Sequence, residues 1–230
     1  MGITNFSQAV RKKDNRKAIF SANKIKHIDE TYAELGGFTP LAWASIYDVV
    51  PVVQTLLSMG ANVEAQMHEG RTALHCAADM NSVDSVVELI SWGASVYATD
   101  VDGYIPLHMA ILSESEGAVD VLIKYNDTLN IGTKDGLTAL HHAVLSSQCD
   151  MVHLLLDKGA NINSLARGNN TALHLATSLH SVDIVQLLLQ SGADVFVANS
   201  EDLCAFSLAL NQGNKTLMDI IWNHIGAVEH

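Results

Sequence analysis

Several features that mark other classes of protein are scarce or missing in this sequence of 230 residues. No apolar run approaches the ~18 residues of a membrane-spanning helix, and the N-terminus lacks the charged-then-apolar signature of a signal peptide. Only three cysteines occur, Cys76, Cys149 and Cys204, without C-x-x-C spacing. Such cysteines favour reduced thiols over a disulfide framework or a metal site. These absences predict a soluble, cytoplasmic protein without a transmembrane segment.

Basic residues are also few, with 13 Lys and Arg against 25 Asp and Glu and a formal net charge of −12. Seven of the basic residues fall within residues 1–34, where four acids leave a balance of +3, and the rest of the chain carries −15. An acidic body repels phosphate backbones, so no binding to nucleic acid is expected. We interpret the basic stretch as the solvated face of a helical cap; contact with a membrane or nucleic acid is the alternative.

The common catalytic motifs are missing as well. Neither an H-E-x-x-H helix, a G-x-S-x-G turn nor a Walker loop occurs. The neighbours His141 and His142 would point about 100° apart on a helix and make a poor chelate. Asp100 and Asp102 lie in a turn, and no opposed environments suggest a general acid and base. We therefore expect no catalytic residue, no metal site, no cofactor and no enzymatic activity.

What the sequence does contain is a four-residue pattern that returns every 33 residues. The copies are Thr39-Pro40-Leu41-Ala42, Thr72-Ala73-Leu74-His75, Ile105-Pro106-Leu107-His108, Thr138-Ala139-Leu140-His141, Thr171-Ala172-Leu173-His174 and the degenerate Cys204-Ala205-Phe206-Ser207. A small-residue position shares this step, at Ala44, Ala77, Ala110, Ala143, Ala176 and Ala209. One position of a second apolar stripe reads Leu57, Ile90, Ile123, Leu156, Leu189 and Trp222. A fixed period of this length predicts stacked helical repeats whose apolar stripes form one continuous core.

With a glycine two residues before each tetrad (Gly37, Gly70, Gly103 and Gly136), the pattern resembles the ankyrin repeat from roughly residue 34 to 228. The resemblance implies an all-α solenoid of helix–turn–helix units joined by β-turn fingers. The expected organisation is an N-terminal helical cap at 1–33, repeats at 34–66, 67–99, 100–132, 133–165 and 166–198, and a degenerate capping repeat at 199–230.

Residues typical of helix ends occur where the expected helices begin and stop. Thr39, Thr72, Thr138 and Thr171 are predicted N-caps, and Gly60, Gly93, Gly159 and Gly192 are predicted to end the second helices in the left-handed region. The third repeat departs from this chemistry, because Ile105 replaces the capping threonine and Asn126-Asp127 replaces Gly-Ala. We therefore expect the third repeat to be the least stable part of the stack.

The family resemblance also assigns roles to side chains. The histidines of the tetrad, His75, His108, His141 and His174, are implied to bridge neighbouring repeats by hydrogen bonds. Asn130 and Asn163 occupy the turn position that is hydroxylated in some ankyrin proteins, but neither has the acidic residue two positions earlier that the preferred motif carries.

The remaining candidates are surface residues. In the family, the fingers and the inner-helix ends form a concave groove. Here an apolar, aromatic-rich row is expected to line this groove through the first four repeats, with a few polar residues beside it. The predicted partner-binding residues are Phe38, Ile46, Tyr47, His68, Arg71, Met80, Tyr104, Leu112, Lys134, Leu137 and Leu145. Trp43 is expected to be half-buried against the cap, and Trp92 is a second candidate contact on the far rim.

The function predicted from these patterns is binding of another protein through the groove, by a chain that is monomeric on its own. The partner is expected to present an apolar anchor with basic surroundings, and Arg71 and Lys134 are placed to pair with its acidic residues. Two alternatives stay open: a regulatory or inhibitory subunit of an enzyme, and an effector of an intracellular microbe acting on a host protein.

Overall fold

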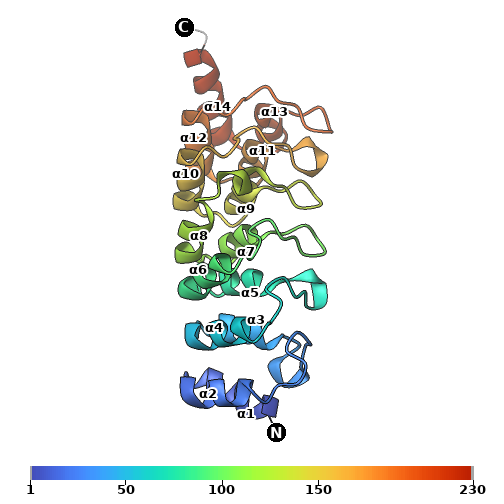
Figure 1. The fold of residues 1–230 in the computed structure, drawn as a ribbon. Coiled ribbons are helices and arrows are strands. Elements are labelled where there is room, and N and C mark those ends of the chain that lie inside the picture. Colours follow the sequence, from blue (N-terminus) through green and yellow to red (C-terminus); the bar gives the residue numbers. More distant parts are fainter. Residues whose placement is uncertain (1, 229–230) are drawn as a thin grey trace. The chain divides into compact units, whose positions relative to one another are not determined.

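The computed structural model describes residues 2–228, in which helices are joined by turns and loops and no strand is formed (Figure 1). The all-α fold expected from the repeats is therefore confirmed. The chain divides into two compact units, Met1–Thr128 and Leu129–His230, called unit 1 and unit 2 below. Met1, assigned above to the cap, and residues 229 and 230, assigned to the last repeat, lie outside the described residues.

Unit 1 consists of four helix pairs with short 3-10 turns between some of them. Its elements are α1 (Gly2–Arg11), α2 (Asn15–Ala22), η1 (Ala33–Leu35), α3 (Pro40–Ile46), α4 (Val50–Ser58), η2 (His68–Gly70), α5 (Ala73–Asp79), α6 (Val83–Ser91), α7 (Pro106–Leu112) and α8 (Glu116–Leu122). The inner helices α3, α5 and α7 lie side by side next to the fingers, and the outer helices α4, α6 and α8 line up behind them (Figure 1).

Unit 2 repeats this arrangement with three helix pairs. Its elements are α9 (Ala139–Leu145), α10 (Cys149–Asp157), η4 (Arg167–Asn169), α11 (Ala172–Ser178), α12 (Val182–Gln190), α13 (Ala205–Asn211) and α14 (Lys215–Val228). Here α9, α11 and α13 are the inner helices and α10, α12 and α14 the outer ones. A further turn, η3 (Asn126–Asn130), includes the last residues of unit 1 and the first residues of unit 2 in the sequence.

The inner helices begin where the tetrad places them. Thr39 has an extended backbone, and its hydroxyl accepts a hydrogen bond from the Ala42 N–H at 3.1 Å. Pro40 follows at the first helical position, where the missing N–H leaves no hydrogen bond unmade. Thr72, Thr138 and Thr171 occupy the same N-cap position in α5, α9 and α11. After the outer helix α4 the chain turns at Gly60, whose φ of +91° suits glycine.

The core contains small side chains where helices approach closely and large apolar side chains elsewhere. The six alanines of the small-residue position have no exposed surface, so the inner helices approach their neighbours closely. Large side chains such as Leu56, Leu89 and Leu188 fill the space behind them and are fully buried. The expectation that Trp222 continues this stripe was wrong, because its side chain is 62% exposed. Within the described residues α14 packs on α12 and α13, which leaves the Trp222 side of the helix uncovered.

Hydrogen bonds between neighbouring helix pairs reinforce the packing in unit 1. Asp48 and Asn81 occupy the tight turn between an inner and an outer helix, with φ of +53° and +52°. The Asp48 carboxylate accepts a hydrogen bond from the Ser85 N–H of the next pair at 2.7 Å, and the Asn81 side-chain oxygen accepts one from the Ala118 N–H at 2.9 Å. These bonds satisfy N–H groups in the first turns of α6 and α8, and they tie each outer helix to the preceding pair.

Candidate partner-binding surface

An aromatic cluster lies at the start of the predicted surface in unit 1. The Trp43 ring is 6.2 Å from the Phe38 ring and 5.0 Å from the Tyr47 ring, centroid to centroid. The Arg11 guanidinium, from the cap, lies 4.8 Å above the Trp43 ring, a cation–π distance. Trp43 is only 5% exposed, rather than half-buried as the sequence predicted, and Phe38 and Tyr47 flank it as half-buried rings. The cluster therefore holds its two outer rings in fixed positions.

The C-terminal ends of the neighbouring inner helices carry exposed apolar side chains. Met80, the C-cap of α5, is 54% exposed, and Leu112, the last residue of α7, is 42% exposed. Ile46, at the corresponding end of α3, is half-buried. Between these ends the Ser113 hydroxyl donates a hydrogen bond to the Asp79 carboxylate, which links the tips of α5 and α7. Unit 1 thus brings Ile46, Met80 and Leu112 to equivalent ends of adjacent helices.

The fingers of unit 1 present His68, Arg71 and Tyr104. His68 is exposed. The Arg71 guanidinium lies 3.7 Å from the carboxylates of both Glu69 and Asp100. Asp100 is buried, and its carboxylate also accepts hydrogen bonds from the Asp102 and Tyr104 N–H groups at 2.9 Å. The structure therefore gives Arg71 acidic partners inside the chain, whereas the sequence suggested that it pairs with acids on another protein.

Unit 2 holds the remaining three predicted contacts. Lys134 is exposed in the finger before α9, and Leu137 is half-buried there. The Leu137 N–H donates a hydrogen bond to the Thr133 hydroxyl at 3.3 Å, which closes the finger. Leu145 ends α9 and is 41% exposed. Leu145 thus occupies in unit 2 the same helix-end position that Leu112 occupies in unit 1.

Sequence reasoning missed the roles that Trp43 and Asp100 play at these surfaces, whereas it did name Trp92 as a candidate contact on the far rim. Trp43 is the centre of the aromatic cluster, which only the tertiary contact with Arg11 reveals. Asp100, in the next finger, pairs with Arg71, and the pair of acids in that turn was its only signal in the sequence. Trp92, the candidate on the rim, is 46% exposed, and its indole N–H donates to the Glu88 carboxylate at 2.8 Å.

Two of the tetrad histidines, His75 and His174, form hydrogen bonds at both ring nitrogens, and His108 and His141 accept the equivalent backbone N–H bond at Nδ1. In unit 1, His75 Nδ1 accepts a hydrogen bond from the Thr72 N–H at 3.2 Å, and Nε2 lies 3.0 Å from the Tyr104 carbonyl of the next finger. His174 repeats this in unit 2, with Nε2 3.0 Å from the Leu203 carbonyl. Burial lowers the pKa of His75, and the hydrogen bond to Tyr104 opposes that shift in part. A neutral ring with its proton on Nε2 fits these partners.

The two turn asparagines that were candidates for hydroxylation form hydrogen bonds within the chain. The side-chain oxygens of Asn130 and Asn163 accept hydrogen bonds from the N–H groups of Asn161 and Asp194, at 2.8 and 3.0 Å. Across residues 2–228 no three His, Cys, Asp or Glu side chains gather closely enough to hold a metal ion. None of the helices in the same span is both long and apolar enough to cross a bilayer.

Comparison with known families and structures supports the repeat assignment. A family model of three ankyrin repeats matches residues 6–100 and 96–166, and a model of a single ankyrin repeat matches residues 168–200. No curated protein matches the sequence. Among solved structures, the ankyrin repeat domain of Bcl-3, described as a unique member of the IkappaB protein family, is similar with a TM-score of 0.82 and 27% identity. That match covers 94% of this chain and 97% of the Bcl-3 chain.

Two further structures show the same fold. The ankyrin repeat domain of human ASB11 has a TM-score of 0.78 at 21% identity, covering 95% of this chain and 96% of its own. An ankyrin repeat domain from Acinetobacter baumannii has a TM-score of 0.73 at 25% identity, covering 80% of this chain and 97% of its own. Ankyrin repeats are typically non-enzymatic modules that bind other proteins. Family models that match most of the sequence place this chain in the ankyrin repeat family.

Proposed function

We propose that this protein binds a partner protein, without catalysing a reaction, through the surface that the fingers and inner-helix ends form in unit 1. The observation that carries the proposal is the exposure of Met80 and Leu112 at the ends of the adjacent helices α5 and α7. Exposed apolar side chains that lie next to each other mark interaction sites far more often than single ones do.

The aromatic cluster extends this surface toward the cap. Phe38 and Tyr47 are half-buried against Trp43, so each ring already has a fixed position before a partner arrives. Binding then orders few side chains, which lowers the entropic cost of association. Aromatic anchors in such positions are typical of the residues that dominate binding energy.

The negative charge around this surface indicates which charge a partner should carry. Residues 35–128 contain twelve acidic residues and only two basic ones, Arg71 and Lys124. Arg71 lies between Glu69 of its own finger and Asp100 of the next finger, so its charge is largely balanced within the chain. A partner with an apolar anchor surrounded by basic residues fits this surface, and its association rate should fall as the salt concentration rises.

The test is capture of the partner from a matched cell lysate with three forms of the protein. These are the wild type, a Met80→Ser and Leu112→Ser variant, and a Val87→Ser and Trp92→Ser control. Val87 on α6 and Trp92 at its end are 51% and 46% exposed, so the control removes similar apolar area from the outer side. Circular dichroism checks that all three forms fold.

A protein that is captured by the wild type and by the control, but lost with the Met80 and Leu112 variant, is the expected result. Loss with the control alone would move the site to the outer rim and refute the proposal. For unit 2, capture with a Leu145→Ser variant tests separately whether the surface of Leu145, Lys134 and Leu137 also contacts the partner. If the captured protein is an enzyme whose activity changes on addition of this chain, the narrower role is that of a regulatory subunit.

A further inference from the structure

The last helix pair of unit 2 leaves an apolar face uncovered. In each preceding helix pair of this unit, the positions equivalent to Phe206 and Leu210 are buried, for example Leu173 at 1% and Thr177 at 0% exposure. On α13, however, Leu210 is 53% exposed and Phe206 is half-buried. Phe206 and Leu210 are four residues apart and share one face of the helix. This face therefore has the shape and composition of a junction between helix pairs but no neighbour among the described residues.

Trp222 on α14 completes this uncovered face. Its ring lies 5.6 Å from the Phe206 ring and is 62% exposed. The equivalent residue on α12, Leu189, is 2% exposed. Asp219 is exposed one helical turn before Trp222, on the same side of α14. Residues 199–230 carry four acidic residues and one lysine, a balance of −3. We call the surface formed by Phe206, Leu210, Asp219 and Trp222 the tail face.

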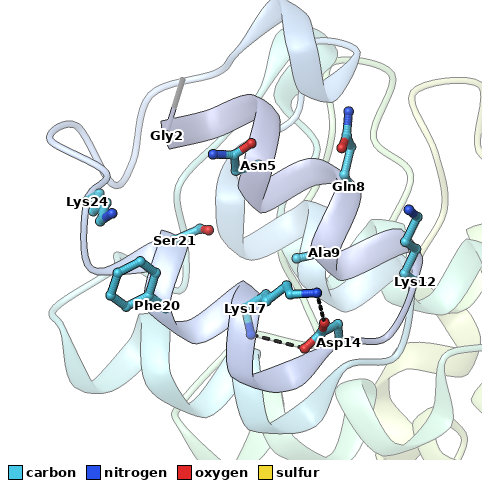
Figure 2. Close-up of a pocket in the computed structure, with 10 residues that line it drawn as sticks. All are labelled: Gly2, Asn5, Gln8, Ala9, Lys12, Asp14, Lys17, Phe20, Ser21 and Lys24. Atoms are coloured by element: carbon cyan, nitrogen blue, oxygen red, sulfur yellow. Dashed lines mark hydrogen bonds and ion pairs between the residues drawn. The ribbon is translucent and has the colours of Figure 1, made fainter.

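The cap of unit 1 carries a surface of opposite charge. A groove of about 390 Å³ runs between α1 and α2, and its lining includes Asn5, Gln8, Lys12, Phe20 and Lys24 (Figure 2). Lys17 lines it too, but its ammonium lies 3.1 Å from the carboxylate of Asp14, also in the lining, so Lys12 and Lys24 carry the positive charge of the groove. Phe20 is 64% exposed, and the Lys24 ammonium lies 4.0 Å over its ring. The opposite sides of these helices are buried, with Phe6, Val10 and Ala18 at 0% exposure. We call the groove with Phe20 and its lysines the head face.

We propose that the head face of one copy of this protein binds the tail face of a second copy, which differs from the monomer that the sequence predicted. Each face presents an exposed aromatic ring with a charged residue close by in the chain: Lys24, just after α2, lies over the Phe20 ring, and Asp219 is exposed three residues before Trp222 on α14. The regions that contain them carry balances of +3 and −3. The tail face is the kind of surface that a helix pair covers elsewhere in the chain, and the α1–α2 pair offers one. Such a head-to-tail contact is heterologous and can continue from copy to copy.

Analytical ultracentrifugation over a range of protein concentrations tests this contact. The wild type should rise above its monomer mass of 24.8 kDa as concentration increases, and added salt should reverse the rise because it screens the opposite charges. A Phe20→Glu variant blocks the head and a Trp222→Lys variant blocks the tail. Both residues are mainly exposed, so both variants should keep the wild-type circular dichroism spectrum. A Trp92→Lys variant, changed at an exposed tryptophan outside both faces, is the matched control.

The decisive measurement mixes the two blocked variants. Each variant alone should remain a monomer, whereas an equimolar mixture should form a dimer and nothing larger, since one copy supplies the only free tail and the other the only free head. The Trp92→Lys control should associate as the wild type does. A wild type that stays monomeric at every concentration overturns the proposal. So does a blocked variant that still associates alone, which would indicate a symmetric contact. Phe20-dependent binding to anionic vesicles without self-association would overturn it in favour of a membrane.

Discussion

Protonation of His142 is predicted to couple the stability of unit 2 to pH. His142 lies on α9 and is 3% exposed, and burial, with a smaller contribution from the neighbouring His141, lowers its pKa from 6.5 to about 4. The equivalent residues of the other repeats are Trp43, Cys76, Met109, Leu175 and Leu208. His142 therefore places a titratable ring in a position that is otherwise apolar.

The sign of the effect follows from proton linkage. Because the pKa is lower in the folded state, the unfolded chain binds the proton first as the pH falls below 6.5, and the free energy of unfolding decreases. The stabilisation is complete above pH 6.5 and is lost progressively down to about pH 4. At about 1.4 kcal/mol per unit of pKa difference, the loss between about pH 7.5 and about pH 4.5 is about 2.5 kcal/mol from this residue alone.

Urea unfolding across this pH range, with wild type and a His142→Leu variant, measures the effect. Leucine occupies the same position in two other repeats, so the variant should fold and differ little from the wild type near neutral pH. As the pH falls, the wild type should lose stability relative to the variant by about 2.5 kcal/mol. Contributions of the histidines that do not interact with His142 cancel in this comparison, which leaves the coupling to His141 as part of the measured difference. Parallel curves for the two proteins, or an NMR titration of His142 with a midpoint near 6.5, would refute the reasoning.

Three further predictions concern other parts of the chain. Burial raises the pKa of the Cys76 thiol to about 12. A disulfide reagent at mildly alkaline pH should therefore label the exposed Cys149 at least tenfold faster than it labels Cys76. Equal labelling rates of the two cysteines, measured by mass spectrometry, would contradict this. Gly136→Ala should destabilise more than Gly159→Ala in chemical denaturation, because both have positive φ but a Cβ at Gly136 would lie 3.1 Å from the Leu165 carbonyl oxygen and at Gly159 would meet nothing within 4 Å. Hydrogen exchange should be fastest in α7 and α8, since α8 has seven residues where α4, α6, α10 and α12 have nine; protection equal to that of α5, α6, α9 and α10 would count against a weak third repeat.

The fold of this protein could be predicted from its sequence alone. A 33-residue step that brings back a capping threonine, an invariant alanine and an apolar stripe leaves one architecture, because local propensity and core packing agree at every copy. Thr39 caps α3 and all six alanines are buried, since these positions depend on a residue's own repeat and on its immediate neighbours. The same periodicity indicated which helix ends carry Met80, Leu112 and Leu145.

How exposed each candidate side chain is, and which internal contacts it makes, follows from the tertiary structure and could not be read from the sequence. The sequence suggested that Arg71 could pair with acids on a partner, but its guanidinium pairs with Asp100 of the next finger, which lies 29 residues further along the chain. Trp43 is buried because Arg11 of the cap covers its ring. Trp222 obeys the periodic pattern and is nevertheless exposed, because burial depends on what packs against a helix from outside, and no periodic pattern records that. Local sequence patterns therefore predict the repeat fold, whereas the exposure of its surface side chains depends on contacts between residues far apart in the sequence.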